Sequence, residues 1–174
     1  MFFTDVRVPT GNLVGGLNEG WRVASGSVGH ERNMLWLSYA DRLQDLIDDW
    51  RPATALERDR YATLVMDNQA LRLLGSAALA RAARGEEDVP ALSVLKTFGA
   101  DAVQAATEHA LSSRGADGLD HAGMTGRDVP LNLDLYASSW ADRYIRSFTG
   151  TIAGGTSEIQ RNIIAQRVLG LPRG

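Results

Sequence analysis

The sequence predicts an all-α protein, an up-and-down helical bundle preceded by one short strand. Most of the 174 residues fall into long segments in which apolar residues recur every three or four positions, the spacing of one helix face. Short breaks rich in Gly, Pro and Asp separate these segments, as in helices that run up and down beside one another. With 44% hydrophobic residues, the chain is long enough to form one domain with a core.

The chain begins with a segment that predicts a strand. Residues 2–9 alternate between apolar and polar side chains well enough for a short strand, and Pro9 with the residues after it ends the run. A lone strand needs partners from another sheet, yet nothing later in the sequence has a strand pattern. This is the first sign that the chain is part of something larger.

Five helices are expected after this strand, over residues 18–50, 55–84, 90–113, 131–147 and 156–169. The first ends before Pro52, because the residue before a proline is pushed out of the helical region. The second is expected to have arginines on one face and to bury the opposite face, which carries Tyr61, Leu64, Val65, Leu71 and Leu74. Residues 115–130 are rich in Gly and Asp and are expected to form a loop.

The last helix has the most informative start. Gly154 and Gly155 permit backbone angles that other residues avoid, and Ser157 with Gln160 fits a capping box. Glu158 adds a negative charge to the first turn, where the helix dipole favours it. An apolar stripe is expected to dock this helix on the core; it consists of Ile159, Ile163, Ile164 and Val168. Such a helix start can hold an anion or a cofactor, but taken alone it is more often an ordinary turn.

Composition argues against several classes of function. A net charge of −3 and scattered basic residues do not favour nucleic-acid binding. No apolar run approaches the length of a membrane span, and the first residues lack the features of a signal peptide. There is no cysteine, and the three histidines have no spacing typical of a metal site. We therefore expect a cytoplasmic protein that binds no metal.

The string Thr151-Ile-Ala-Gly-Gly-Thr-Ser-Glu-Ile-Gln-Arg161, continued to Pro172, closely resembles the C-terminal signature of the acyl-CoA dehydrogenase family. The beginning of the chain resembles the end of the middle β domain of that family. The resemblance therefore implies that residues 1–16 are a remnant of the β domain with a linker, and that residues 17–174 form the C-terminal helical domain.

The resemblance also implies a reaction, the α,β-desaturation of an acyl-CoA thioester, in which a carboxylate takes the α-proton while FAD accepts a hydride. In many members the glutamate stands in the C-terminal signature, but here that position is Gly154, which cannot act as a base. A second group, similar to the long-chain and isovaleryl enzymes, carries it in the first helix before an arginine, where this chain has Glu31-Arg32. On local grounds Glu31 is one of 21 acidic residues and could be an ordinary solvated carboxylate.

Given the resemblance, we expect Glu31 to be the base, with a pKa raised by burial. Arg32 is expected either to line the substrate region or to form an ion pair within its helix. Gly154 leaves extra room there, which suits a branched or bulky acyl group. Thr156 and Glu158 are expected to contact FAD, and Gly115 to contact a flavin held mainly by a neighbouring subunit.

Two departures from the family affect that shared flavin site. The glutamine usual before the glycine loop is Ser112, and the arginine-phenylalanine-glycine motif between the first two helices is absent. Relatives that assemble from unlike subunits show similar losses, so either a homo-oligomer or a hetero-oligomer with a related subunit is open. An electron-transfer partner is also implied.

The resemblance covers nearly all of this chain, but family members are roughly twice as long. We therefore expect the chain to need a missing half, in the same or another protein, to complete the flavin site. Two interpretations follow. The chain is the C-terminal part of an acyl-CoA dehydrogenase that catalyses the desaturation, or it is a non-catalytic assembly subunit or truncated fragment that depends on a partner chain.

Overall fold

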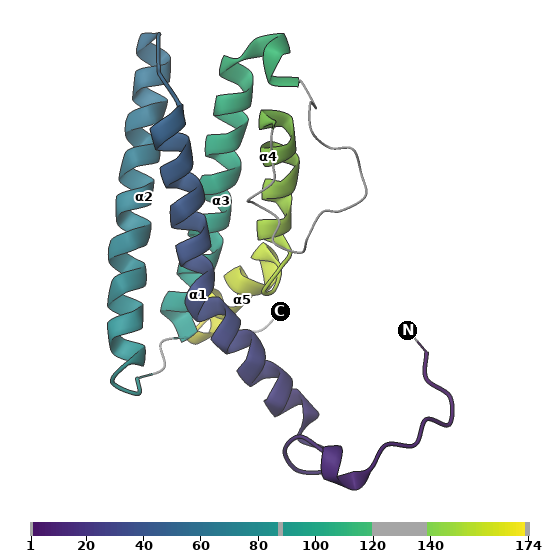
Figure 1. The fold of residues 1–174 in the computed structure, drawn as a ribbon. Coiled ribbons are helices and arrows are strands. Elements are labelled where there is room, and N and C mark those ends of the chain that lie inside the picture. The colour runs from purple at the N-terminus through teal and green to yellow at the C-terminus, as the bar shows by residue number, and fades with distance from the viewer. Residues whose placement is uncertain (1, 87–88, 120–138, 173–174) are drawn as a thin grey trace.

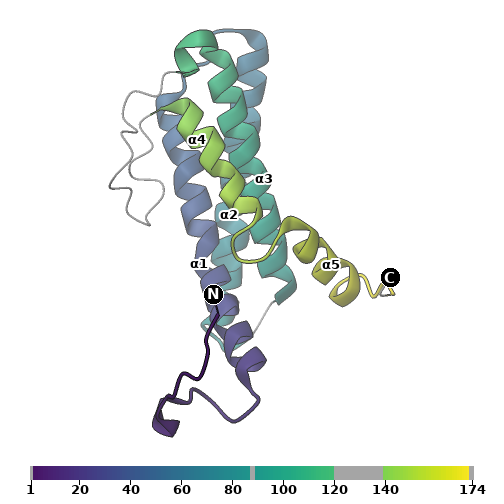
Figure 2. The same cartoon turned by 90° about the vertical axis from the view of Figure 1, so that its right-hand side faces the viewer.

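The computed structural model describes residues 2–86, 89–119 and 139–172. It contains helices α1 (Gly20–Asp49), α2 (Ala55–Ala82), α3 (Val89–Ser113), α4 (Trp140–Ser147) and α5 (Ser157–Arg167), and the 3-10 turns η1 (Thr10–Asn12), η2 (Gly115–Leu119) and η3 (Phe148–Thr151). The three long helices lie side by side, α4 runs along α3, and α5 turns away near one end of the bundle (Figures 1 and 2). The expected all-α bundle is confirmed.

The core forms where the three long helices meet. It is built mainly from Trp36, Tyr39, Leu43, Leu46, Leu64, Leu71, Leu95, Ala100, Val103, Ala106 and Ala110, all buried. The alanines belong to α3, which contacts all four other helices. Small residues on this central helix allow its neighbours to approach closely.

Two glycines mark the closest approaches between the long helices. A Cβ built on Gly75 of α2 would lie 2.2 Å from the ring of Trp36 on α1. A Cβ on Gly99 of α3 would lie 2.4 Å from the ring of Tyr39, also on α1. Each aromatic ring thus occupies the space that a side chain at the glycine would need.

Local signals set the helix boundaries. α1 ends at Asp49, where the chain becomes extended before Pro52, as expected. α2 begins with a capping box, in which the Thr54 hydroxyl accepts a hydrogen bond from the Glu57 N–H while the Glu57 carboxylate accepts one from the Thr54 N–H. Ser139 caps α4 in a similar way by accepting a hydrogen bond from the N–H of Asp142.

The expected strand is wrong. Residues 2–9 form no strand, and the part of the chain that the structure describes contains no sheet with which they could pair. Asp5, with φ +54°, interrupts the extended run. Within the expected loop, residues 115–119 form the turn η2, and residues 120–138, which include the first part of the expected fourth helix, lie outside the described residues. None of the described helices is long and apolar enough to cross a membrane.

Candidate functional site

The turn that precedes α5 has a conformation that requires glycine. Gly154 has φ +68° and Gly155 has φ +100°, both in the left-handed region that other residues rarely adopt. Gln160, one turn into α5, reaches back and donates a hydrogen bond from Nε2 to the Gly154 carbonyl at 3.1 Å. This bond ties the two-glycine turn to the helix that follows it.

The N-cap of α5 is Thr156 rather than the expected Ser157. Thr156 has the extended backbone of an N-cap (φ −62°, ψ 158°), and its hydroxyl accepts from the Ile159 N–H at 3.4 Å. Ser157 is already the first helical residue. The left-handed turn ends at Gly155, so Thr156 is the residue that stands between the turn and the helix. Its hydroxyl is buried and has no hydrogen-bond partner among the described residues.

Glu158 places its carboxylate at the start of α5, as its position in the first turn suggests. Hydrogen bonds from its own N–H and from the Thr156 hydroxyl, together with the positive charges of Arg161 and Lys96, hold the pKa of Glu158 below its usual range. The Lys96 side chain comes from α3 and is only 1% exposed. The start of α5 therefore combines an exposed carboxylate with a buried ammonium group.

The turn is also attached to the body of the bundle. Tyr39 of α1 is buried, and its hydroxyl donates a hydrogen bond to the Gly150 carbonyl at 3.4 Å. Tyr39 and Lys96 were not predicted from the sequence to belong to this site. The sequence does contain a sign that Lys96 is buried. Lys96 stands four positions before Ala100 and therefore lies on the same face of α3, which is buried.

The expected docking of α5 through its apolar stripe is wrong in part. Ile159 and Val168 are each 50% exposed, whereas the buried residues of α5 are Ser157 and Gln160. The glycine turn fixes how α5 is rotated about its axis, and this rotation directs Gln160 inward to reach the Gly154 carbonyl. Half of the apolar stripe consequently faces outward.

Glu31 and Arg32 lie in α1, but the side chains of residues 27–33 are outside what the structure describes. Position 31 is eight residues before Tyr39, about 12 Å along the helix. Because Tyr39 contacts Gly150, α1 carries position 31 at the same end of the bundle as the α5 turn. The first half of α1, which contains position 31, and helix α5 thus lie toward the same end of the bundle (Figure 1).

Gly115 lies near the opposite end of α3. Its φ is +55°, and the space where a side chain would stand is open. From Lys96 to Ser113, α3 rises by about 26 Å, so the structure does not bring Gly115 together with the start of α5.

A cation stack adjoins Gly115. The guanidinium of Arg114 lies 3.9 Å from the centre of the Trp140 ring, and that of Arg143 lies 4.8 Å from it. Burial, together with the nearby charge of Arg143, lowers the pKa of Arg114, and Asp49 opposes this effect. The stack fastens η2 to α4 and was not foreseen from the sequence.

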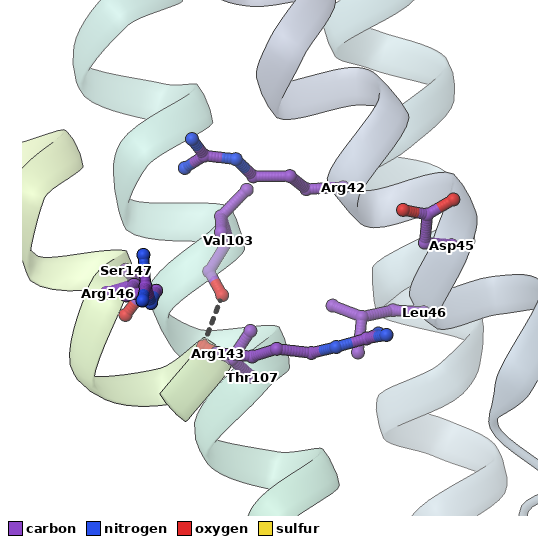
Figure 3. A pocket seen from close by; sticks show the side chains of 8 residues that line it. All are labelled: Arg42, Asp45, Leu46, Val103, Thr107, Arg143, Arg146 and Ser147. Atoms are coloured by element: carbon purple, nitrogen blue, oxygen red, sulfur yellow. Dashed lines mark hydrogen bonds between the residues drawn. The ribbon is translucent and has the colours of Figure 1, made fainter. Parts of the chain in front are cut away.

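A pocket lies between α1, α3 and α4, with side chains from all three helices around it (Figure 3). Its lining consists of Arg42, Asp45, Leu46, Val103, Thr107, Arg143, Arg146 and Ser147. Three guanidinium groups and one carboxylate give it a positive character that suits an anionic group. No set of three or more potential metal ligands lies close together in the described part of the chain.

Comparisons with known proteins agree with this geometry. The family model "Acyl-CoA dehydrogenase, C-terminal domain" matches residues 18–169. Acyl-CoA dehydrogenase IpdE1 of Mycolicibacterium smegmatis is 32% identical over 181 residues, which cover 99% of this chain and 42% of that protein. The chain spans less than half the length of the curated relatives that it matches.

Solved structures share the fold. The Tcur3481-Tcur3483 steroid ACAD superposes with a TM-score of 0.76 at 22% identity, over 99% of this chain and 45% of that one. The ChsE4-ChsE5 complex from Mycobacterium tuberculosis superposes with a TM-score of 0.70 at 21% identity, over 99% and 46%.

Proposed function

Since the chain belongs to the acyl-CoA dehydrogenase family and carries its C-terminal helical domain, we propose that it contributes to the FAD-dependent α,β-desaturation of an acyl-CoA thioester. The observation that supports this most is the α5 turn, in which the left-handed Gly154 and Gly155 lead into the Thr156 cap of a helix that packs on α3. We further propose that residues 1–16 are the remnant of a β domain and that residues 17–174 are the helical domain.

The residues at the start of α5 fit a flavin dinucleotide. Such a cofactor has a chain of hydroxyl groups, which need both donors and acceptors. The exposed Glu158 carboxylate would supply acceptors, and the buried Ser157 hydroxyl, which is unpartnered among the described residues, would supply a donor. The Thr156 hydroxyl already donates to Glu158 and accepts from the Ile159 N–H, so it would offer its remaining lone pair. Gly115, with open space around it, would contact the flavin of a neighbouring subunit.

When bound, FAD supplies the acceptor for a hydride from the β-carbon of the acyl group. Glu31 is proposed to take the proton from the α-carbon, so that the electron pair of the broken Cα–H bond forms the new double bond. Gly154 has no side chain to act as a base and leaves room beside the acyl group. Arg32 is proposed to line the substrate region or to pair with a carboxylate in α1.

The test uses this chain with the remainder of the enzyme, supplied as a partner half or subunit, and with FAD. The substitution Glu31→Gln should lower kcat about 10²- to 10⁴-fold, the usual contribution of a general base. The matched control is Glu108→Gln, because Glu108 is an exposed carboxylate on α3, away from the α5 turn. Glu108→Gln should leave kcat unchanged, and flavin absorbance should migrate with the complex in both variants.

A second candidate function is that of a non-catalytic assembly subunit. It is favoured by the likeness of this chain to a protein of the ChsE4-ChsE5 complex. Under this alternative, Glu31→Gln would leave turnover of the complex intact, and omission of the chain would abolish it. That result would refute Glu31 as the base.

A further inference from the structure

The buried face of α5 is polar rather than apolar. After the glycine turn, α5 turns away from the three long helices and packs chiefly on α3 (Figure 2). Its buried residues are Ser157 and Gln160, and Gln160 is 0% exposed. The Oε1 atom of Gln160 has no hydrogen-bond partner among the described residues. Burying such an atom costs free energy, so another contact of the same side chain has to offset that cost.

The offsetting contact is the hydrogen bond from Gln160 Nε2 to the Gly154 carbonyl, at 3.1 Å. That carbonyl belongs to the peptide unit between Gly154 and Gly155, whose φ angles are +68° and +100°. A peptide unit between two glycines turns over easily, because neither neighbour has a Cβ that would clash. Gln160 therefore holds this unit with its oxygen toward α5. In a trans peptide the N–H points away from the C=O, so the Gly155 N–H points to the opposite side of the turn.

We propose that Gln160 is a positioning residue that holds the Gly154–Gly155 peptide unit in one orientation and thereby shapes the acyl pocket beside Gly154. The inference rests on the proposed function, in which Gly154 leaves room for the acyl group. The acyl group lies on the side of the Gly155 N–H, because Gln160 and α3 close the other side. If the unit turned over, the Gly154 oxygen would take up part of that room, and a branched acyl group would lose more than a straight one.

Two substitutions in α5 separate this role from general support of the helix. Gln160→Met keeps the length of the side chain and a good helix former, but methionine cannot donate a hydrogen bond. The control is Arg161→Met, which removes the 3.3 Å ion pair between Arg161 and Asp101 of α3 and leaves the bond from Gln160 to the turn in place. Both variants should keep the helix content of the unsubstituted chain in circular dichroism.

The first experiment measures the order of the turn in the chain itself by ¹⁵N relaxation in solution. The amide of Gly155 should have an order parameter near the rigid value of about 0.85 in the unsubstituted chain and in Arg161→Met. In Gln160→Met it should fall below about 0.6, the range of flexible backbone. Equal values in the unsubstituted chain and Gln160→Met, or an equal fall in both variants, would overturn the proposal.

The second experiment uses the chain with the remainder of the enzyme and FAD. It compares kcat/KM for the straight-chain and the α-methyl-branched acyl-CoA that the unsubstituted complex desaturates fastest. In Gln160→Met the ratio of branched to straight should fall about two- to tenfold, the effect of one neutral hydrogen bond, and in Arg161→Met it should stay unchanged. A loss of stability alone would lower both values equally and leave the ratio as it was.

The outcomes separate this inference from the proposed function. If the unsubstituted complex desaturates both thioesters and Gln160→Met leaves the ratio unchanged, the pocket role of Gln160 is overturned and the proposed function stands. If the unsubstituted complex desaturates no acyl-CoA, the proposed function is overturned and the pocket role of Gln160 falls with it.

Discussion

The substitution Gly75→Ala should destabilise the bundle, although alanine is the better helix former. Its Cβ would stand 2.2 Å from Cδ2 of Trp36 and within 2.5 Å of two further ring atoms. Carbon atoms that are not bonded prefer a separation of about 3.5 to 4.0 Å, so the overlap exceeds about 1 Å. Trp36 is 4% exposed and is surrounded by the core, so its ring can retreat only if α1 and α2 move apart.

The magnitude follows from two opposing effects. Forcing an extra carbon into a packed core typically costs about 1 to 3 kcal/mol. Replacing glycine by alanine within a helix returns about 1 kcal/mol. An overlap of more than 1 Å on a buried ring belongs at the upper end of that cost, so the expected net loss for Gly75→Ala is about 2 kcal/mol. Gly26 of α1 provides the control, because a Cβ there would meet nothing within 4 Å.

The assay is urea denaturation followed by far-ultraviolet circular dichroism. Gly75→Ala should lower the midpoint without changing the slope, since the surface exposed on unfolding stays the same. Gly26→Ala should leave the midpoint unchanged or raise it. If Gly75→Ala proved as stable as the unsubstituted chain, the close contact between α1 and α2 would be refuted.

Three further predictions concern the α5 turn and the cation stack. Thr156→Ala removes the N-cap and should lower the free energy of unfolding by about 1 kcal/mol. Ser157→Ala should have little effect, because the Ser157 hydroxyl has no hydrogen-bond partner among the described residues. Urea denaturation of the two variants distinguishes these outcomes. Folding lowers the pKa of Glu158, so the Glu158 carboxylate stabilises the folded chain above the ordinary glutamate pKa of 4.5. This stabilisation is lost as the pH falls through the lower pKa of the folded state. Glu158→Gln should remove this part of the acid dependence from unfolding curves measured across pH. Trp140→Leu should destabilise the chain by about 1 kcal/mol more than Trp140→Phe, because phenylalanine keeps an aromatic face for Arg114; equal thermal unfolding would contradict this.

Hydrophobic periodicity and helix breakers were enough to predict the bundle. Leu64 and Leu71 are buried as expected, because residues seven positions apart return to the same face of a helix. Leu74 was expected on that face too, and this was wrong: it lies at the edge of the face and is 49% exposed. Pro52 ended α1 as expected, because its effect on the preceding residue is local. Features decided by a few neighbouring residues were thus accessible from the sequence alone.

Features that depend on the path of the backbone could not be predicted from the sequence alone. Thr156 and Ser157 are both good N-cap residues, and only the left-handed Gly154 and Gly155 determine which of them the helix uses. Residues 3–8 alternate like a strand, but alternation supplies no partner for pairing. The cation stack on Trp140 joins residues far apart in the sequence, which no local pattern can reveal.

On the outer side of α5, hydrophobic periodicity predicts which residues share a face but not what covers that face. The spacing of Ile159 and Val168 correctly indicates an apolar stripe, but it cannot say whether this chain or another covers that stripe. In the structure, the bundle buries Ser157 and Gln160 instead and leaves those two residues half-exposed. In a family whose curated members are more than twice as long as this chain, exposed apolar residues beside the α5 turn suit contact with the remainder of the enzyme.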